Sequence, residues 1–312
     1  VTACHTLLAL ALADLNTYCS TRILNYNPST HAVTLAKIQP LLVCDGVECI
    51  VCDDGSTDDS AVFVQTQYPQ IQLILHKESK GLIYSRNRLL DLVTTEFAIS
   101  LDDDAHFITA NALSVIADYF AANPNCGVLA LRIFWGLTAP NSVVTTETPT
   151  RVQGFVGCGH VWRMKAWRTI PDYPDWFIFY GEEDFASYQL FKNNIEIHYL
   201  PEVLVHHRVD VKARKNSSDY TLRLRRSLRS GWYLYFLFYP LRMIPRKMAY
   251  SIWMQLQLKV FKGDFKALYA LILALSDLIF AVPKIIKNTN RLAPEEYRIY
   301  QKLAPTRVYW KP

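Results

Sequence analysis

Short apolar runs alternate with segments of helical periodicity along the first hundred residues of the chain. The apolar runs predict four strands, at residues 21–24, 48–52, 71–76 and 97–101. The segments between them predict helices at residues 30–42, 58–68 and 82–93. Strands that alternate with helices are typical of βαβ units. We therefore expect an α/β fold with a mostly parallel sheet that helices flank.

Polar clusters follow three of the predicted strands. These clusters are Asn25-Tyr26-Asn27, Asp53-Asp54 and Asp102-Asp103-Asp104. Because ligands bind beyond the carboxyl ends of strands in an open parallel sheet, the clusters are expected to share one crevice. Five aspartates in one crevice would repel one another unless a cation or a donor-rich ligand neutralised them. The pattern therefore predicts a metal site.

Asp102 and Asp104 are the best candidates for metal ligands. They lie two residues apart at the end of an extended strand, so their carboxylates point to the same side. Such a pair suits a hard divalent cation, Mg²⁺ or Mn²⁺. The alternative is a solvated acidic loop that caps the next helix. The second acidic cluster, Asp53-Asp54, favours the metal.

The composition is that of a globular protein. Of the 312 residues, 51% are hydrophobic and 20% are charged, which excludes a disordered or collagen-like chain. The seven cysteines form no disulfide framework, so we expect a reducing compartment. Cys49 and Cys52 form a CxxC, but residues three apart on a strand face opposite ways, which argues against a redox or zinc site.

Charge is distributed unevenly along the chain. There are 12 basic residues against 22 acidic ones up to His207, and 21 against 6 after it. The basic part includes four arginines between Arg223 and Arg229, followed by the aromatic run 232–239. Basic and aromatic residues together favour an anionic membrane surface. The alternative is that these helices pack on the preceding part of the chain or on a second copy, as a homodimer. No nucleic-acid motif is present, so no nucleic-acid partner is expected.

Taken together, the motifs resemble those of the family 2 glycosyltransferases. The matching segments are Ile23-Leu24-Asn25-Tyr26-Asn27, Cys52-Asp53-Asp54-Gly55-Ser56, Lys80-Gly81-Leu82 with Ser85-Arg86-Asn87, Leu101-Asp102-Asp103-Asp104, Gly181-Glu182-Glu183-Asp184, and Pro201 through His206-His207. Their order and spacing fit the family over roughly residues 20–208. The resemblance implies the GT-A fold, a Rossmann-like sheet that binds a nucleotide sugar.

The resemblance also implies a role for each matching residue. Asp104 and His207, with His206 as the competing choice, correspond to metal ligands, and Asp102 to a contact with the metal or the ribose. The nucleotide site corresponds to Asn25, Tyr26, Asp53, Asp54 and Asp103 together with Arg86, a partner of the diphosphate or of the aspartate motif. The family's catalytic base corresponds to Glu183 or to its neighbour Asp184. The aromatic residues 176–180 are candidates for an acceptor platform, although core packing is the commoner role for any one of them.

The expected activity is inverting sugar transfer from a nucleoside-diphosphate sugar to a glycan or lipid-linked acceptor, with Mn²⁺ or Mg²⁺. By family analogy the setting is surface polysaccharide synthesis, in the cytoplasm at the inner face of the plasma membrane. A nucleotidyltransferase is disfavoured, because residues 27–30 lack the glycine-rich phosphate loop that it requires. The remaining alternative is a catalytically inactive, membrane-associated protein that binds sugar nucleotides or glycans.

Three segments are expected. Residues 1–19 predict a short helical segment, residues 20–210 the catalytic domain, and residues 211–312 a basic, aromatic-rich helical extension that faces a membrane or a dimer partner. The apolar run 267–282 would be about 24 Å long as a helix, short of the roughly 30 Å hydrocarbon core of a bilayer. Asp277 lies within this run and would be costly in lipid. We therefore expect no membrane-spanning segment.

Overall fold

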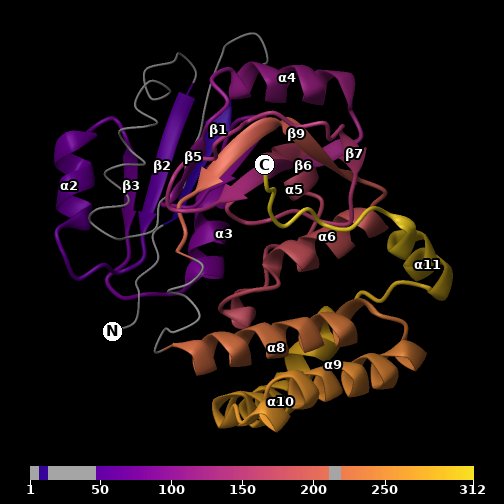
Figure 1. Cartoon of the computed structure of the whole chain (residues 1–312). Helices are drawn as coiled ribbons and strands as arrows, with labels where there is room; N and C mark the ends of the chain where they lie inside the picture. The colour runs from indigo at the N-terminus through magenta and orange to yellow at the C-terminus, as the bar shows by residue number, and fades with distance from the viewer. Residues whose placement is uncertain (1–6, 13–46, 211–218) are drawn as a thin grey trace.

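The structure, a computed structural model, describes residues 7–12, 47–210 and 219–312. A central sheet with helices on both faces lies above a separate layer of C-terminal helices (Figure 1). The sheet has nine strands in the order β3-β2-β1-β4-β8-β6-β9-β5, and β7 pairs with β9. This arrangement confirms the α/β fold class with a C-terminal helical region.

The strands and helices have the following bounds. The strands are β1 Leu7–Leu12, β2 Val47–Asp53, β3 Gln72–Leu75, β4 Phe97–Leu101, β5 Ala105–Phe107, β6 Cys126–Trp135, β7 Thr150–Arg151, β8 Gly159–Arg163 and β9 Glu196–His207. The α-helices are α2 Ser60–Gln67, α3 Leu82–Leu92, α4 Ala112–Ala122, α5 Met164–Trp167, α6 Glu182–Lys192, α8 Tyr220–Phe238, α9 Ile244–Leu258, α10 Phe265–Asn288 and α11 Pro294–Lys302. Three 3₁₀ turns are η1 Asp175–Phe177, η2 Leu241–Met243 and η3 Val260–Lys262.

Strand direction brings the ends of five strands to one edge of the sheet. β1 is antiparallel to both β2 and β4, and β8 is antiparallel to both β4 and β6, whereas β3 is parallel to β2 and β9 to β6. Consequently β2, β3, β4, β6 and β9 all run the same way and finish at the same edge. The expectation of a mostly parallel sheet is wrong for neighbouring strands, because β1 and β8 are inserted antiparallel between strands that share a direction.

The sequence-based elements between residues 47 and 101 are confirmed with small shifts of their bounds. The strands β2, β3 and β4 correspond to the three predicted strands, and the helices α2 and α3 correspond to the two predicted helices. The predicted strand 21–24 and helix 30–42 lie outside the described residues. The helix expected within residues 1–19 is wrong for Leu7–Leu12, which form β1. This apolar run is bonded by β2 on one side and β4 on the other, and such pairing outweighs local helix propensity.

The core lies on both faces of the sheet. All five residues of β4 are buried, as expected for a strand covered by helices on both sides. On one face Phe97 stacks on Phe120 of α4, with ring centroids 4.7 Å apart. On the other face α3 buries Ile83, Leu89 and Leu90. A central strand packed in this way holds the residues that follow it, 102–104, in a fixed position.

The basic, aromatic stretch that predicted membrane contact is buried in the protein. Trp232 and Phe238 of α8 are enclosed by other residues, and Arg229 donates from Nη2 to the carbonyl oxygen of Phe177 at 2.7 Å. Arg225 and Arg229 both pair with Asp277 of α10. These contacts favour the alternative that this stretch packs on the catalytic domain, because α8 lies between that domain and α10.

The end of the chain returns to the catalytic domain. The amide of Trp310 donates to the carbonyl oxygen of Ile133 in β6 at 2.6 Å, and the guanidinium of Arg132 lies 4.4 Å from the Trp310 ring centroid. Tyr300 of α11 donates its hydroxyl to the carbonyl oxygen of Gln153 at 2.7 Å. The C-terminal region is therefore continuous in packing with the sheet.

Candidate active site

A cleft of about 230 Å³ lies at the edge where β2, β4, β6 and β9 end. Strand register explains why distant residues meet there. Leu101 at the end of β4 pairs with Gly159 at the start of β8, and Ala105 of β5 pairs with His207 at the end of β9. The residues directly after β4, before β8 and at the end of β9 therefore converge, and Asp102, Cys158 and His207 all line the cleft.

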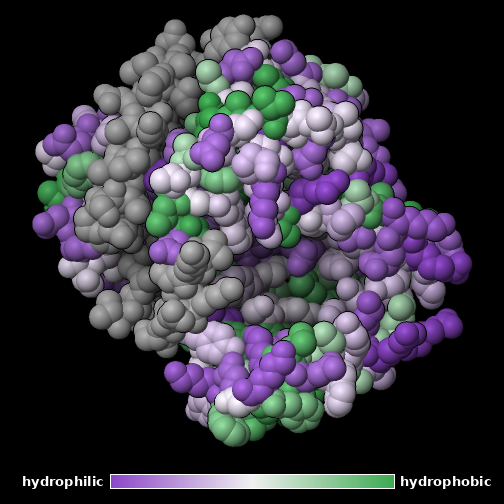
Figure 2. Space-filling view, viewed as in Figure 1, coloured by the Kyte–Doolittle hydropathy of each residue, from purple (hydrophilic) through white to green (hydrophobic). Residues whose placement is uncertain are grey.

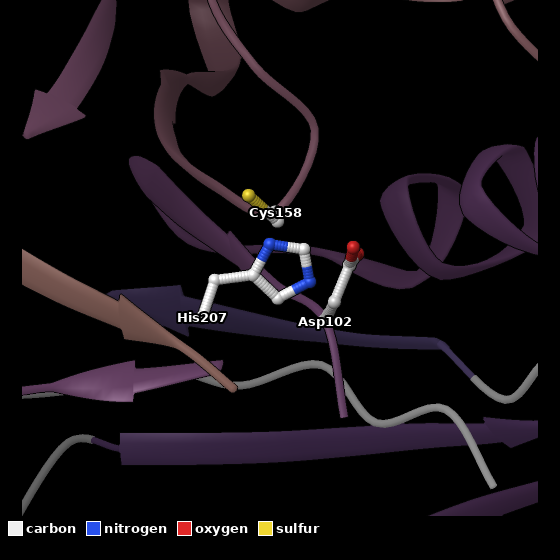
Figure 3. Close-up of side chains that lie close together, drawn as sticks. All are labelled: Asp102, Cys158 and His207. Atoms are coloured by element: carbon white, nitrogen blue, oxygen red, sulfur yellow. The ribbon is translucent and has the colours of Figure 1, made fainter. Parts of the chain in front are cut away.

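These three side chains form a group with the spacing of a metal site. Asp102, Cys158 and His207 each offer one donor atom, and the three donor atoms lie within 4.8 Å of one another. Figure 3 shows the imidazole of His207 between Cys158 and the Asp102 carboxylate, with the three side chains coming from separate parts of the fold. Carboxylate, thiol and imidazole are all donors to divalent transition metals. The predicted pairing of Asp102 with His207 is thus seen in the structure, together with a cysteine that sequence reasoning missed.

Asp104 lies beside the same group. Its Oδ1 is 2.8 Å from Nε2 of His207, an ion pair when the imidazole is protonated. A carboxylate oxygen and an imidazole nitrogen at this distance can both serve as ligands of a divalent cation once the imidazole is neutral. The residues present therefore match the divalent metal that the sequence motifs imply.

The electrostatics of His207 agree with a cation site. Burial disfavours the charged imidazolium, yet the Cys158 sulfur and the Asp104 carboxylate outweigh it and hold the pKa of His207 well above its usual value. His206 is different, because its Nε2 lies 2.7 Å from the carbonyl oxygen of Gly136 and it does not line the cleft. Of the two candidate histidines, only His207 reaches the site.

The three consecutive aspartates differ in whether they line the cleft. Asp102 and Asp104 line the cleft, as their spacing predicted, whereas Asp103 is 5% exposed and does not line it. Burial, together with the adjacent charges of Asp104 and Asp102, holds the pKa of Asp103 well above its ordinary value. A carboxyl group in such surroundings is a poor ligand for a nucleotide in the cleft, so the structure does not bring Asp103 to the site.

Arg86 connects the aspartate motif to the predicted catalytic base. This buried side chain of α3 contacts Glu182 Oε1 at 2.6 Å, Glu183 Oε1 at 3.1 Å and Asp102 Oδ1 at 3.2 Å. Burial opposes the charge of Arg86, but Glu182, Glu183 and Asp102 raise its pKa above the ordinary value. One arginine thus fixes three carboxylates from two elements, which keeps Glu183 close to the metal-binding group.

Glu182 is the buried member of this cluster. Its side chain is 1% exposed, and burial followed by the nearby Glu183 charge raises its pKa to about 8, although Arg86 acts in the opposite direction. Burial thus favours the protonated form of Glu182, whereas the contact with Arg86 favours the charged form.

Glu183 and Asp184 occupy different surroundings at the start of α6. Glu183 lines the cleft, whereas Asp184 is exposed and does not.

The helix α6 starts after Gly181, whose φ is +89°, and Tyr180 also has a positive φ of 71°. A non-glycine residue in this region is strained, and such strain often occurs at functional sites. A Cβ at Gly157 would overlap the Glu183 carboxylate and the Arg86 guanidinium, so the facing loop requires glycine there.

The aromatic residues before α6 also differ in whether they line the cleft. Phe179 and Tyr180 line the cleft. Phe177 is fully buried, and Trp176 packs on Tyr233 of α8 with ring centroids 5.1 Å apart. Only the second half of the expected acceptor platform is therefore available to a ligand.

The carboxylate of Asp54 is hydrogen-bonded by other residues of the protein. Its carboxylate is completely buried and has five polar partners, which are His76 Nδ1 at 2.9 Å, Ser79 Oγ at 2.7 Å, Lys80 N at 2.8 Å, Gly81 N at 2.9 Å and Ser85 Oγ at 3.0 Å. Burial alone would raise the pKa of Asp54, but these hydrogen bonds lower it below the ordinary value. Asp54 therefore holds the loop 76–81 against the end of β2.

Asp53 keeps an acceptor atom available. Its Oδ1 accepts a hydrogen bond from the Ser56 amide at 2.7 Å, and its buried Oδ2 has no hydrogen-bond partner among the described residues. Neither aspartate lines the cleft, and of the two only Asp53 has a carboxylate oxygen without a hydrogen-bond partner among the described residues. Asn25 and Tyr26, which the motif places in the same nucleotide site, lie outside the described residues.

Sequence reasoning missed two members of the site, Cys158 and Glu182. Cys158 lies between two glycines, and this Gly-Cys-Gly segment directly before an apolar strand was the available signal. Glu182 belongs to the acidic cluster at the start of α6, but nothing local distinguishes its buried position from that of its neighbours.

Comparison with known proteins agrees with this geometry. The sequence model of Glycosyl transferase family 2 matches residues 38–170. A search of curated protein sequences gives no match. The solved structure of GalNAc-T7 with UDP, GalNAc and Mn²⁺ has a TM-score of 0.55 at 14% identity, over 72% of this chain and 49% of that one. This chain thus spans about half the length of that protein.

A second solved structure covers more of the chain. S. aureus TarS 1–349 in complex with UDP has a TM-score of 0.51 at 17% identity, over 83% of this chain and 80% of that one. At such identities the likeness shows the fold, and both structures are glycosyltransferases of the GT-A type. The family resemblance and the fold that the sequence implied are thereby confirmed. Residues 38–170 thus match Glycosyl transferase family 2, and the fold of the chain is that of the GT-A glycosyltransferases.

Proposed function

We propose that this protein is a metal-dependent, inverting glycosyltransferase that uses a nucleoside-diphosphate sugar. The observation that carries the proposal is that a metal-binding group and a carboxylate lie in one cleft. Asp102, Cys158 and His207 form the group, and Glu183 lies nearby because both it and Asp102 pair with Arg86. The two solved structures of this fold, described with UDP and in one case with Mn²⁺, support a nucleotide-sugar donor.

Asp102, Asp104 and His207 would hold the metal, with the Cys158 sulfur as an additional donor. When bound, a divalent cation stabilises the negative charge that develops on the leaving diphosphate. A mixed set of oxygen, nitrogen and sulfur donors favours Mn²⁺ over Mg²⁺, because Mg²⁺ prefers oxygen ligands alone. Asp53 would accept a hydrogen bond from the nucleotide base through its unpaired Oδ2.

Glu183 would act as the general base. The acceptor hydroxyl transfers its proton to the Glu183 carboxylate as its oxygen forms a bond to the anomeric carbon of the donor sugar. The bond from that carbon to the diphosphate breaks, and the electron pair leaves with the diphosphate. Attack from the face opposite the leaving group inverts the anomeric configuration. Arg86 keeps Glu183 in place, and a correctly positioned base contributes about 10²–10⁴-fold to a rate.

The acceptor is proposed to be a glycan or a lipid-linked sugar. Phe179 and Tyr180 line the cleft next to Glu183, and aromatic rings pack well on the C–H faces of sugars. We place the reaction in surface polysaccharide synthesis on the cytoplasmic side of the plasma membrane, which follows from the family resemblance. The competing function is that of an inactive protein that binds sugar nucleotides or glycans.

The test combines donor binding with turnover. Isothermal titration with UDP-, dTDP- and GDP-sugars, with and without Mn²⁺, identifies the donor, and donor hydrolysis then measures turnover. We expect Glu183→Gln to reduce turnover at least about 100-fold while donor binding is retained. Asp184→Asn is the matched control, because this neighbouring carboxyl group does not line the cleft, and it should stay within about threefold of the wild type. Donor binding without turnover in the presence of glycan acceptors would favour the inactive binding protein.

A further inference from the structure

The C-terminal helices form a layer whose outer side is apolar. The inner face of α10 carries small residues that pack on α8 and are buried, including Ala267, Ala270 and Ala274. These positions recur at intervals of three and four, which places them on one side of the helix. The rest of α10 is therefore free of α8, and its residues decide what the layer contacts.

The opposite side of α10 exposes large apolar side chains. Phe265 is 75% exposed, Ile279 70% and Phe280 82%. Tyr269, Ile272 and Ile286 extend the same side of the helix, and each of them is more than half exposed. Figure 2 shows hydrophobic surface along the lower margin of this layer. Exposed apolar surface of this extent is typical of an interaction site.

The neighbouring helix α9 and the turn η3 add exposed aromatic residues. Tyr250, Trp253 and Phe261 are each more than half exposed, and the rings of Trp253 and Phe261 lie in an edge-to-face contact with centroids 6.1 Å apart. Tryptophan and tyrosine are the side chains most favoured at the boundary between lipid and water. We call the outward residues of α9, η3 and α10 the outer face.

The outer face is strongly basic. Residues 241–288 contain eight lysines and arginines and two acidic residues, Asp264 and Asp277. Both acidic side chains are engaged within the layer. Asp277 pairs with Arg225 at 2.7 Å, and Asp264 accepts the Ala267 amide at 2.9 Å as the cap of α10. Exposed lysines such as Lys262 of η3 and Lys287 of α10 therefore flank the apolar side chains.

α10 is long enough to cross a membrane but is placed so that it cannot. It is the one helix among the described residues with the length and apolar composition for this, and its 24 residues extend about 36 Å, so the length expected from the sequence was too short. However, its inner face packs on α8, and Asp277 is ion-paired there. With its inner side held against α8, the exposed apolar side of α10 is suited to lie along a membrane surface.

We infer that the outer face docks the protein on an anionic membrane surface. The apolar and aromatic side chains would enter the boundary between headgroups and acyl chains, and the flanking lysines would contact anionic headgroups. A second copy of the chain is a poorer occupant, because two such basic faces would repel each other. The site differs from the one that the sequence suggested, since α8 is buried and α9 and α10 carry the exposed residues.

The experiment measures binding of the full chain to lipid vesicles and requires no enzymatic turnover. Co-sedimentation is compared between vesicles of phosphatidylcholine alone and vesicles that also contain phosphatidylglycerol. We expect binding to the anionic vesicles only, with at least tenfold weaker binding at high salt. A triple variant, Phe265→Ser, Ile279→Ser and Phe280→Ser, should lose at least tenfold in affinity. Val62→Ser, which changes an exposed apolar residue on α2 of the catalytic domain, is the matched control and should bind as the wild type does.

Two further measurements guard against indirect effects. Lys262→Gln with Lys287→Gln should weaken binding to anionic vesicles and reduce its salt dependence, without removing any apolar side chain. Circular dichroism should show the same helix content in all variants. Equal binding to neutral and anionic vesicles, or binding that the triple variant retains, would overturn the inference. So would a dimer in analytical ultracentrifugation that the triple variant converts to a monomer, because a second copy would then occupy the outer face.

Discussion

Asp53 and Asp54 are adjacent, yet the structure predicts opposite effects when each is changed to asparagine. Asp54 Oδ1 has three polar partners, His76, Lys80 N and Ser85, and Oδ2 accepts from Ser79 Oγ and Gly81 N. An asparagine retains one acceptor oxygen and presents an amino group where the other oxygen was. The donors that faced that oxygen then lose their acceptor.

The cost of Asp54→Asn follows from these contacts. If the remaining oxygen keeps its three partners, the Ser79 hydroxyl and the Gly81 amide lose theirs. Each unsatisfied buried donor costs about 1–3 kcal/mol, and the hydroxyl can rotate to recover part of this. We therefore expect Asp54→Asn to lower the free energy of unfolding by about 2–4 kcal/mol. The midpoint of thermal unfolding should fall by at least about 5 °C.

The contribution of Asp54 to stability should also depend on pH in a defined direction. The fold lowers the pKa of Asp54, so its contribution to stability is fully present above the unfolded-state value of about 4 and is lost as the pH falls through the folded-state value. In Asp54→Asn this part of the acid destabilisation should be missing. Urea unfolding at a series of pH values measures both the offset and the slope.

Asp53→Asn serves as the comparison. Its Oδ2 has no hydrogen-bond partner among the described residues, so the change should cost less than about 1 kcal/mol in stability while it weakens binding of the nucleotide at least about tenfold. Titration calorimetry with UDP measures the second effect. If Asp54→Asn left stability unchanged and weakened nucleotide binding as much as Asp53→Asn, the assignment of Asp54 to the loop would be refuted.

Two further variants test the centre of the site. Because the fold raises the pKa of Glu182 to about 8, the folded state binds a proton more tightly than the unfolded state, and stability should decrease between about pH 4.5 and pH 8 and then level off. Glu182→Gln should remove this decrease in urea unfolding, and an unchanged slope would contradict the assignment. For the metal site, titration of the wild type with Co²⁺ should give a near-ultraviolet sulfur-to-metal absorption band, since the Cys158 sulfur is one of the donors. Cys158→Ser should lose the band while the control Cys49→Ser keeps it, and a band retained in Cys158→Ser would exclude the sulfur as a ligand.

The chemical identity of the site was readable from the sequence because it depends on local spacing. The spacing of Asp102 and Asp104 suggested that both carboxylates reach one site, and both line the cleft whereas Asp103 does not. The backbone reason differs from the expected one, because residues 102–105 form a turn closed by the Ala105 amide and the Asp102 carbonyl oxygen at 2.9 Å, and not a continued strand. The elements between residues 47 and 101 were also predictable, since their apolar periodicity is local.

The division of roles among adjacent residues was decided by tertiary structure. Nothing in the local pattern distinguishes Asp54 from Asp53, and only the loop 76–81 supplies the donors that occupy Asp54. Likewise, the position of Glu183 in the cleft depends on Arg86 of α3, almost a hundred residues earlier in the chain. Contacts between distant segments set burial and hydrogen bonding, and these in turn set which carboxylate is available to a ligand.

The C-terminal helices show the same division between sequence and structure. Composition determined that this region is basic, aromatic and helical, because these properties belong to the residues themselves. Which helix is enclosed and which is exposed depends on packing, since α8 and α10 are both apolar enough to be buried. Asp277 pairs with arginines of α8 and thereby fixes which side of α10 faces inward. The opposite side, with its exposed apolar and basic residues, was therefore determined by the tertiary structure and not by the sequence pattern alone.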